Sequence, residues 1–379
     1  MDNFIAYLDA QKAKTTFDYF AVADFAHAVN VHYANQNLGD PTFTGYESWQ
    51  NKHAANIVVP PPEPKRQKTI DASLSTIADL IKVIDENPYE SDVQYNFDLK
   101  SLHNIRTELG ELNDMIGMNT LKSSVFTQLI YFIQNLHMDD KKKTSDFKHT
   151  IICGPPGTGK TEVAKIIGRM YSKVGILKKD TFKKVTRTDL VAGYLGQTAL
   201  KTSKVISDSI GGCLFIDEAY SLADGDIYSK ECIDTICEAL SDHRDDLMVI
   251  IAGYEDELDE TFFRANSGLR SRFIWKFKID AYNANEMDRI FTKKVAQQNW
   301  TLDCDTEKWF ESKIAEFKYF GRDVELLLSH IKICHSRRIF GQDESNRKKI
   351  NMDDINAGYK VFLENNKQKI NPIPYGLYV

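Results

Sequence analysis

Short apolar runs rich in β-branched residues alternate with longer amphipathic segments through the middle of the chain. Three of these runs are His149–Cys153, Cys213–Asp217 and Met248–Ala252, and Lys184–Thr186 is a shorter β-branched run. Strands that alternate with helices are typical of α/β folds, in which helices cover both faces of a parallel sheet. The pattern therefore predicts an α/β fold with a mainly parallel sheet over residues 105–280.

After residue 280 the apolar positions recur only at helical spacing, up to about residue 368. This predicts a helical region over residues 281–368 and a short tail at 369–379. Upstream of the sheet, one amphipathic stripe predicts a helix that Asp71 would cap and Asn87-Pro88 would end. The stripe consists of Leu74, Ile77, Ala78, Ile81 and Ile84.

Residues 1–59 contain ten aromatic side chains, a density above the 11% of the whole chain. We interpret them as a small, mostly helical domain, whose aromatics form either its core or a surface for an adaptor or partner. The run Pro60–Pro64 favours polyproline II, so residues 60–104 are expected to be a stiff linker with a connecting helix. The basic stretch Lys65–Lys68 is interpreted as solvated linker, with a nuclear signal as the alternative.

Composition narrows the protein class without naming a function. The chain has 379 residues, 42% hydrophobic and 27% charged, which is enough for two or three domains of about 150 residues each and excludes full disorder. No apolar run is long enough for a membrane span, and no signal peptide is visible. A net charge of −6 argues against a nucleic-acid partner. Six cysteines without metal-ligand spacing indicate a reducing compartment such as the cytoplasm.

One segment has the spacing of a phosphate-binding loop, with an apolar run before it and a helical pattern from Glu162 onwards. Glycines in such a loop let the backbone N–H groups wrap phosphates, and the helix N-terminus adds positive potential. The lysine bridges the β- and γ-phosphates, and the final hydroxyl ligates Mg²⁺. The residues expected to bind the nucleotide here are Gly154, Pro155, Pro156, Gly157, Thr158, Gly159, Lys160 and Thr161 of the loop and the following Glu162.

A second acidic signal supports the phosphate loop. The apolar run Cys213–Ile216 ends in Asp217 and Glu218. Two carboxylates at the end of a strand are common, but together with a phosphate loop they indicate nucleotide hydrolysis. Asp217 would hold Mg²⁺ through water, and Glu218 would act as the general base on the attacking water.

With these motifs the sequence resembles the AAA+ ATPases, and within them the CbbX-like branch, which includes red-type Rubisco activase and stage V sporulation protein K. The resemblance covers roughly residues 105–365. Besides the two motifs above, it is carried by Leu190–Ala199, Asp242–Leu247, Val249–Tyr254 and Asn266–Phe273.

The resemblance implies a P-loop AAA+ module with a C-terminal helical lid, assembled into homo-hexameric rings with ATP and Mg²⁺ at the subunit interfaces. Arg272 matches the arginine finger that reaches the neighbour's γ-phosphate, with Arg270 as the alternative. Arg322 matches the second sensor, which contacts nucleotide from the lid. Tyr254 stands where many members have a polar sensor asparagine. The adenine pocket would be lined by Met115, Ile116 and Gly117.

The resemblance also assigns a substrate-contacting loop. Gly193-Tyr194-Leu195-Gly196 matches the first pore loop, in which Tyr194 and Leu195 would grip an extended polypeptide by packing. The leading hypothesis is therefore a ring-forming ATPase that remodels or threads a protein substrate. The alternatives are a nucleic-acid motor on the same fold, such as a helicase or packaging ATPase, and a scaffold that uses nucleotide only to assemble.

Overall fold

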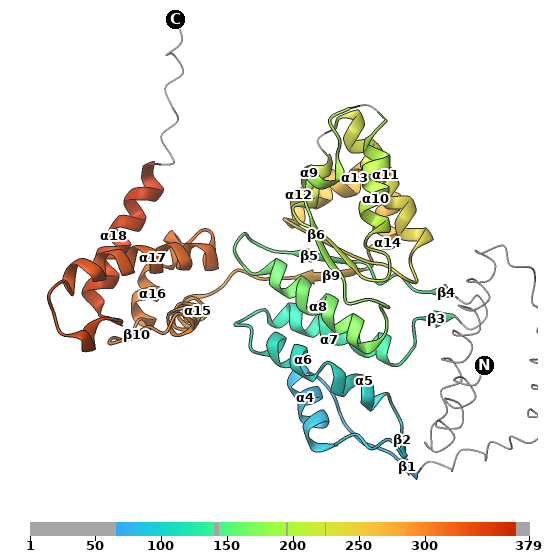
Figure 1. Cartoon of the computed structure of the whole chain (residues 1–379), viewed down its shortest axis with the longest axis horizontal. Coiled ribbons are helices and arrows are strands. Elements are labelled where there is room, and N and C mark those ends of the chain that lie inside the picture. Colours follow the sequence, from blue (N-terminus) through green and yellow to red (C-terminus); the bar gives the residue numbers. More distant parts are fainter. Residues whose placement is uncertain (1–65, 140–143, 195, 224, 369–379) are drawn as a thin grey trace, which may run out of the picture. The chain divides into compact units, whose positions relative to one another are not determined.

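The computed structural model describes residues 66–139, 144–194, 196–223 and 225–368 (Figure 1). The chain divides into two compact units, Met1–Pro64 and Lys65–Val379, and the account below concerns the second. The domain expected over residues 1–59 and the tail at 369–379 lie outside the described residues. The domain boundaries expected at residues 104 and 280 stay predictions.

A five-stranded parallel sheet forms the centre of the α/β part, in the order β6-β7-β8-β5-β9. Four of its strands coincide with the predicted apolar runs, so the predicted α/β fold is confirmed. The fifth, β9, was not predicted. The strands are β5 (Thr150–Cys153), β6 (Phe182–Val185), β7 (Cys213–Ile216), β8 (Met248–Gly253) and β9 (Trp275–Lys278).

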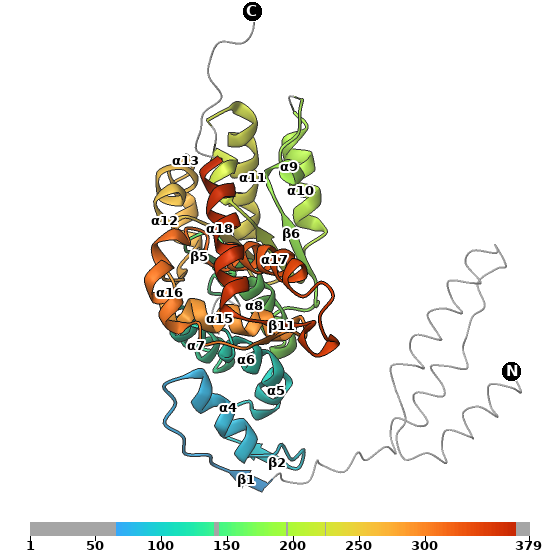
Figure 2. The same cartoon turned by 90° about the vertical axis from the view of Figure 1, so that its left-hand side faces the viewer.

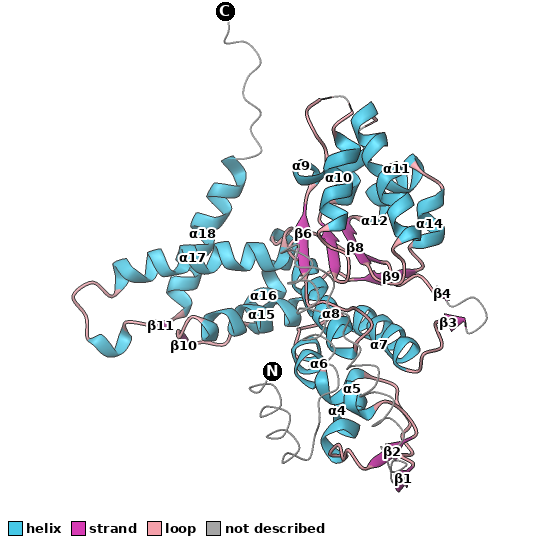
Figure 3. Ribbon diagram, turned by 45° about the vertical axis from the view of Figure 1, so that its right-hand side comes forward, coloured by secondary structure: helices cyan, strands magenta, loops and turns pink. Residues whose placement is uncertain are grey.

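The two faces of the sheet pack against different sets of helices, because successive strand residues point to opposite sides. On one face, Phe215, Ile250 and Phe277 join a core with the helices that precede β5 and with α8. On the other face, Leu214 and Ile251 join a core with α10, α11 and the short helices before β9. Figure 3 shows the strands in magenta with cyan helices on both sides.

The helices of the described residues occupy most of the remaining chain, and each is too short or too polar to span a lipid bilayer. Before β9 they are α4 (Ile77–Glu86), α5 (Leu99–Asn104), α6 (Arg106–Asn113), α7 (Asn119–Ile133), α8 (Lys160–Val174), α9 (Arg187–Leu190), α10 (Thr198–Ser207), η2 (Ala219–Ala223), α11 (Ile227–Asp242), α12 (Glu255–Glu257), η3 (Leu258–Phe262), α13 (Phe263–Ala265) and α14 (Gly268–Arg272). After β9 they are α15 (Ala284–Gln297), α16 (Glu307–Lys313), η4 (Ile314–Glu316), α17 (Phe320–Arg338), η5 (Glu344–Asn346) and α18 (Met352–Gln368).

The region after β9 contains the predicted helical periodicity, and its helices pack on one another (Figure 2). A short parallel pair, β10 (Thr301–Leu302) and β11 (Lys349–Ile350), lies among them and was not predicted. Inside this region Asp354 is buried and accepts hydrogen bonds from Arg338 and His335. The carboxylate is thus compensated, as a buried charge must be.

The segment before α6 is more than a single helix. Its strands β1 (Arg66–Lys68) and β2 (Val93–Tyr95) pair in parallel. Outside this segment, a small antiparallel pair, β3 (Met138–Asp139) and β4 (Thr144–Ser145), follows α7. The predicted helix is present as α4, but Asp71 does not cap it. Thr76 does, in a capping box with Asp79, so the helix starts later than predicted. Its end at Asn87 agrees with the prediction.

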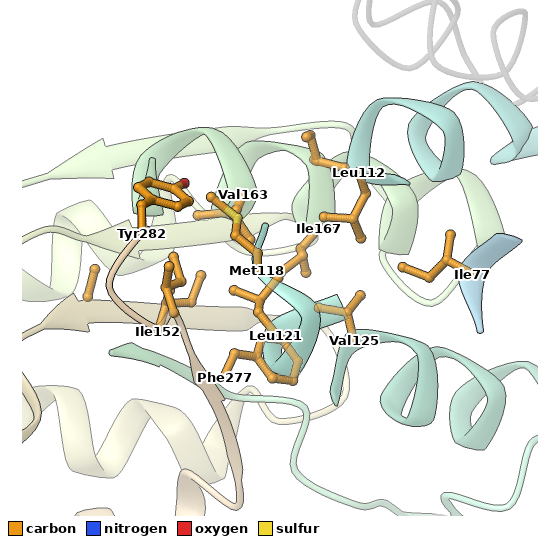
Figure 4. Close-up of a cluster of buried hydrophobic side chains, with 14 of the residues drawn as sticks. Ile77, Leu112, Met118, Leu121, Val125, Ile152, Val163, Ile167, Phe277 and Tyr282 are labelled. Atoms are coloured by element: carbon orange, nitrogen blue, oxygen red, sulfur yellow. The ribbon is translucent and has the colours of Figure 1, made fainter. Parts of the chain in front are cut away.

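A single hydrophobic cluster connects α4, α7 and α8 with the sheet (Figure 4). Ile77 of α4, Val125 of α7 and Ile167 of α8 are buried in it together with Phe277 of β9. Met118 and Tyr282 lie at the end of the cluster beside the phosphate-binding loop. These two side chains beside the predicted loop are therefore continuous with the core, which holds them in place.

His149, directly before β5, is buried and neutral. Its Nε2–H donates to the carbonyl of Leu240, and its Nδ1 accepts from the backbone N–H of Val249. Burial, assisted by the charges of Lys148 and Arg272, lowers the pKa of His149 to about 3. The folded protein therefore excludes a proton that the unfolded chain binds below pH 6.5.

This pKa shift predicts a loss of stability in acid. Between pH 6.5 and about 3, unfolding takes up one proton at His149, so the free energy of unfolding should fall by about 1.4 kcal/mol per pH unit from this group. Urea unfolding at pH 7.5 and 5.5 measures the effect. His149→Gln should be less stable at pH 7.5 but lose less between the two values; an unchanged pH dependence would contradict the assignment.

Candidate nucleotide-binding site

The predicted phosphate loop joins the carboxyl end of β5 to the N-terminus of α8. Gly157 and Gly159 both have positive φ, 73° and 91°, which glycine adopts without strain. At Gly157 a Cβ would also collide with the carbonyl oxygen of Tyr319. Thr158 closes the loop by donating from Oγ1 to the carbonyl of Pro155, at 2.8 Å. The backbone thus curves around the N-terminus of α8, where N–H groups and helix dipole favour phosphate.

Lys160 begins α8 and turns back across the loop. Its Nζ donates to the carbonyls of Gly154 and Pro155, at 2.7 and 2.8 Å. Burial lowers the pKa of Lys160 below its usual value, and the carboxylates of Asp217 and Glu218 oppose that shift. A partly desolvated ammonium with only two backbone acceptors is suited to binding the phosphates of a nucleotide.

Lys160 also lies over an aromatic pair. Its Nζ is 5.3 Å from the ring centroid of Tyr254, which follows β8, and Tyr254 stacks on Tyr220 at 5.7 Å. Tyr220 belongs to η2, directly after the acidic pair. Tyr254 and Tyr220 therefore form an aromatic pair beside the lysine, connected to the turn that follows Glu218.

The two carboxylates end β7 as predicted, next to the phosphate loop. Asp217 lies at the carboxyl end of the sheet, and its Oδ2 is 2.6 Å from Nζ of Lys184 on the neighbouring strand β6. Glu218 has an exposed side chain and a φ of 53°, a left-handed conformation that a non-glycine residue adopts at a cost of about 1–3 kcal/mol. Such strain is concentrated at functional sites, and here it turns the chain away from the strand.

A pocket of about 430 Å³ extends from the phosphate loop. The segment between α6 and α7 contributes Met115, Ile116 and Met118, and the far side is contributed by α15 and α17. An apolar wall next to a phosphate-binding loop suits a flat base attached to a polyphosphate. The other lining residues are Gly157, Thr158, Gly159, Glu162, Tyr282, Ile290, Lys293, Lys294, Gln297, Gly321, Arg322 and Glu325.

Gly117, the third residue of the predicted adenine segment, does not line this pocket. It has a φ of 65° and turns the chain before α7, and a Cβ there would contact Glu286 and Tyr282. The turn at Gly117 lets the preceding residues Met115 and Ile116 face the pocket. Glycine is required here for the turn and for the close approach of α15.

The region after β9 contacts the phosphate loop directly, from the start of α17 and from the segment before α15. The N–H of Gly321 donates to the carbonyl of Gly157 at 3.1 Å, and the hydroxyl of Tyr282 donates to the carbonyl of Thr158 at 3.0 Å. Arg322, exposed at the start of α17, lines the pocket, and its charge contributes to the lowering of the Lys160 pKa. Changes at the loop can therefore reach α15 and α17 through two hydrogen bonds.

The donor set of the site fits a magnesium ion. Thr161 follows Lys160 in the first turn of α8, and Asp217 offers a half-buried carboxylate. Mg²⁺ prefers oxygen ligands and is usually held by one or two protein groups, several waters and the phosphates of the nucleotide. A hydroxyl and a carboxylate beside a phosphate loop meet that description.

The candidate finger residues lie on α14, outside this pocket. Arg272 donates from Nε to the hydroxyl of Ser241 and from Nη1 to the carbonyl of Gly268, both at 2.7 Å. Arg270 forms an ion pair with Asp259 at 3.0 Å and lies over the ring of Phe263. Within one chain, neither guanidinium is among the residues that line the nucleotide pocket.

Tyr194 lies in the loop between α9 and α10 and is 74% exposed. Its flanking residues Gly193 and Gly196 have open space around them, since a Cβ at either would meet no atom within 4 Å. Leu195, the second predicted gripping residue, lies outside the described residues. The exposed ring therefore belongs to a projecting loop and not to the core of its own domain.

Several side chains of the site gave no signal in the sequence. Lys184 and Tyr282 are single polar residues in ordinary strand and loop patterns, and only the fold brings them to Asp217 and Thr158. Met118 reads as a core methionine before α7, which it also is. Pattern and spacing reveal a loop that binds phosphate, but not the neighbours that tertiary packing adds to it.

The comparisons with known proteins agree with this geometry. Residues 150–274 match the "ATPase family associated with various cellular activities (AAA)". A putative cfxQ-like protein of Acanthamoeba polyphaga mimivirus is 41% identical over 285 residues, covering 73% of this chain and 69% of that protein. Stage V sporulation protein K of Bacillus subtilis is 33% identical over 257 residues, covering 66% and 76%.

Among solved structures, a Thermotoga maritima RuvB variant has a TM-score of 0.45 at 19% identity, covering 66% of this chain and 72% of its own. The sequence relatives carry more weight, because identity above 30% extends over two thirds or more of their length. With the phosphate loop and the acidic strand end side by side, the chain belongs to the AAA family of ATPases, in the CbbX-like branch with cfxQ-like proteins and stage V sporulation protein K, and is an ATP hydrolase.

Proposed function

We propose that the chain is a ring-forming ATPase that couples ATP hydrolysis to the remodelling or threading of a protein substrate. The observation that carries this proposal is the exposure of the Tyr194 side chain. The ring is 74% exposed, between two unhindered glycines, on a loop attached to α9. α9 in turn is hydrogen-bonded to the turn that follows Glu218.

The chemistry of this loop favours a polypeptide as its ligand. An aromatic ring can pack on backbone and side chains of any extended peptide without reading its sequence. Binding of nucleic acid would instead require cations for its phosphates, and Gly193–Gly196 has none. The net charge of −6 points the same way.

For hydrolysis we assign one role to each residue of the phosphate site. Gly154–Gly159 and Lys160 bind the β- and γ-phosphates. Glu218 accepts the proton of the attacking water as general base. Thr161 and Asp217 would hold Mg²⁺, which when bound neutralises charge on the phosphates. Met115 and Ile116 bind the adenine, with Gly117 shaping their turn, and Arg322 contacts the nucleotide from the lid.

The remaining requirement is a cation at the γ-phosphate. Arg272 is absent from the nucleotide pocket of its own chain, and so we assign it to the pocket of an adjacent copy, as an arginine finger in a homo-hexamer. An arginine that is already hydrogen-bonded at the protein surface can exchange those bonds for phosphate oxygens. Arg270 is the alternative for this role.

The proposal also gives the other parts of the chain a role. The lid at 281–368 would move with the nucleotide state, because it bonds the phosphate loop through Gly321 and Tyr282. Residues 1–59 would bind an adaptor or client. The six free thiols fit a reducing compartment such as the cytoplasm.

Tyr194 provides the test. Tyr194→Ala removes one aromatic contact per subunit, worth about 1 kcal/mol. It should leave basal ATPase activity and ring assembly near wild type while abolishing client remodelling and client-stimulated turnover. Tyr194→Phe should behave like wild type, because the ring and not the hydroxyl makes the contact. Clients for the assay come from capture on a Glu218→Gln variant with ATP.

Two outcomes would overturn the proposal. If Tyr194→Ala remodels its client as well as Tyr194→Phe does, the loop does not grip the substrate. If DNA stimulates the ATPase and captured proteins do not, the alternative of a nucleic-acid motor is favoured.

A further inference from the structure

Arg187 links two parts of the molecule that the sequence gives no reason to connect. It is the first residue of α9, between β6 and the loop of Tyr194, and its side chain is 25% exposed. Nη1 donates to the carbonyl of Ser221 at 2.7 Å and to the hydroxyl of Ser229 at 2.8 Å, while Nη2 pairs with Asp226 at 2.8 Å. One guanidinium thus bonds η2 and the start of α11 together.

The carbonyl that Arg187 holds belongs to the turn that carries Glu218. The N–H of Ser221 donates to the carbonyl of Glu218 at 2.9 Å, so the two residues close one turn. Glu218 has the strained φ of 53°, which persists only where surrounding contacts enforce it. The hydrogen bond from Arg187 to Ser221 is one such contact.

The same side chain also binds the start of α11. Asp226 is the N-cap of α11, and its second oxygen accepts from the N–H of Ser229. By binding Asp226 and Ser229 together, Arg187 holds the first turn of α11 beside η2. A planar guanidinium can serve these separate acceptors at once, whereas a lysine ammonium is a single point charge.

Arg187 can hold other elements in place only if its own helix, α9, is held in place. Thr186 and Asp189 form a capping box at its start. At its end, Lys201 of α10 donates to the carbonyls of Thr188 and Val191, at 2.6 and 3.0 Å, and Thr202 donates to that of Leu190 at 3.1 Å. The helix that carries Arg187 is therefore hydrogen-bonded to α10.

We propose that Arg187 is a positioning residue for ATP hydrolysis, which acts by holding the Glu218 turn in its strained conformation. The inference rests on the proposed role of Glu218 as general base. Arg187 does not line the nucleotide pocket, so its loss should affect the orientation of the base and not the binding of ATP.

The test is kinetic. Arg187→Met should lower kcat by about 10- to 100-fold, the order expected when a catalytic group is displaced by about 1 Å, while KM and the dissociation constant for ATP stay within about twofold of wild type. Arg187→Lys should recover part of kcat. Lys183→Met serves as the matched control. It removes a cation from the adjacent strand β6 that forms an ion pair with Asp208 at 3.0 Å, and kcat should not change.

A double variant separates this inference from the proposed function. Because Arg187 acts through Glu218, Arg187→Met should add no more than about twofold to the loss already caused by Glu218→Gln. A full multiplicative loss, or a parallel fall in ATP affinity and thermal midpoint, would overturn the positioning role. If Arg187→Met has wild-type kcat while Glu218→Gln is slow, only the positioning role of Arg187 is rejected. If Glu218→Gln hydrolyses ATP at a near wild-type rate, the role of Glu218 as general base is rejected.

Discussion

Glu218→Gln should bind ATP with near wild-type affinity and hydrolyse it at least about 100-fold more slowly. The amide keeps the size of the side chain but cannot accept the proton of the attacking water. The groups proposed to bind the phosphates, Gly154–Gly159 and Lys160, are not changed by the substitution. Binding is measured with a fluorescent ATP analogue, and turnover by phosphate release under saturating ATP.

The matched control for this variant is Glu238→Gln, which removes an exposed carboxylate from α11 without changing the site. It should hydrolyse ATP at the wild-type rate. Near-normal hydrolysis by Glu218→Gln would remove Glu218 from the role of base. A loss of ATP binding would instead show that the strained turn at Glu218 supports the phosphate site as a whole.

Arg272→Ala should reduce ATP hydrolysis by about 1,000-fold or more, the range of arginine fingers in phosphoryl transfer, and leave ATP binding intact. The reason is that a finger meets the γ-phosphate chiefly in the transition state, where the charge is greatest. In a single chain Arg272 instead bonds Ser241 and Gly268. The variant is compared with wild type by single-turnover hydrolysis and by equilibrium ATP binding.

Arg270→Ala is the natural comparison, because Arg270 shares the helix α14 but pairs with Asp259. A larger loss of hydrolysis in Arg270→Ala than in Arg272→Ala would exchange the two roles. A loss of ring assembly in both variants, measured by light scattering, would make α14 an interface helix without a finger.

Sequence pattern sufficed where the physical signal is local. Three of the four predicted strands, β5, β7 and β8, are buried along their whole length and read as continuous apolar runs. The fourth, β6, contains two lysines and is only partly buried, and Val185 beside Thr186 was its signal. β9 was missed for the opposite reason: in Trp275–Lys278 only Phe277 is fully buried, and two lysines alternate with the aromatics at the sheet edge. The helix start at Asp71 was wrong because Thr76 offers a capping box with Asp79 closer to the buried stripe.

The same distinction between local motifs and long-range contacts applies to the candidate site. The phosphate loop and the acidic pair are each a contiguous motif, so local pattern and spacing predicted both. The contacts of Lys160 with Tyr254, of Gly157 with Gly321 and of Asp217 with Lys184 join residues that lie far apart in the chain or on different strands. Only tertiary packing creates such pairs, and no periodicity or motif encodes them.

The central claim is that ATP is hydrolysed between copies of the chain, with Glu218 from one and Arg272 from the next. The most direct measurement is the ATPase rate of rings mixed from Glu218→Gln and Arg272→Ala subunits, each inactive alone. Mixed rings contain interfaces that join an intact Glu218 to an intact Arg272, and we expect them to recover activity in proportion to the number of such interfaces. Stable mixed rings that remain as inactive as either parent would contradict the claim.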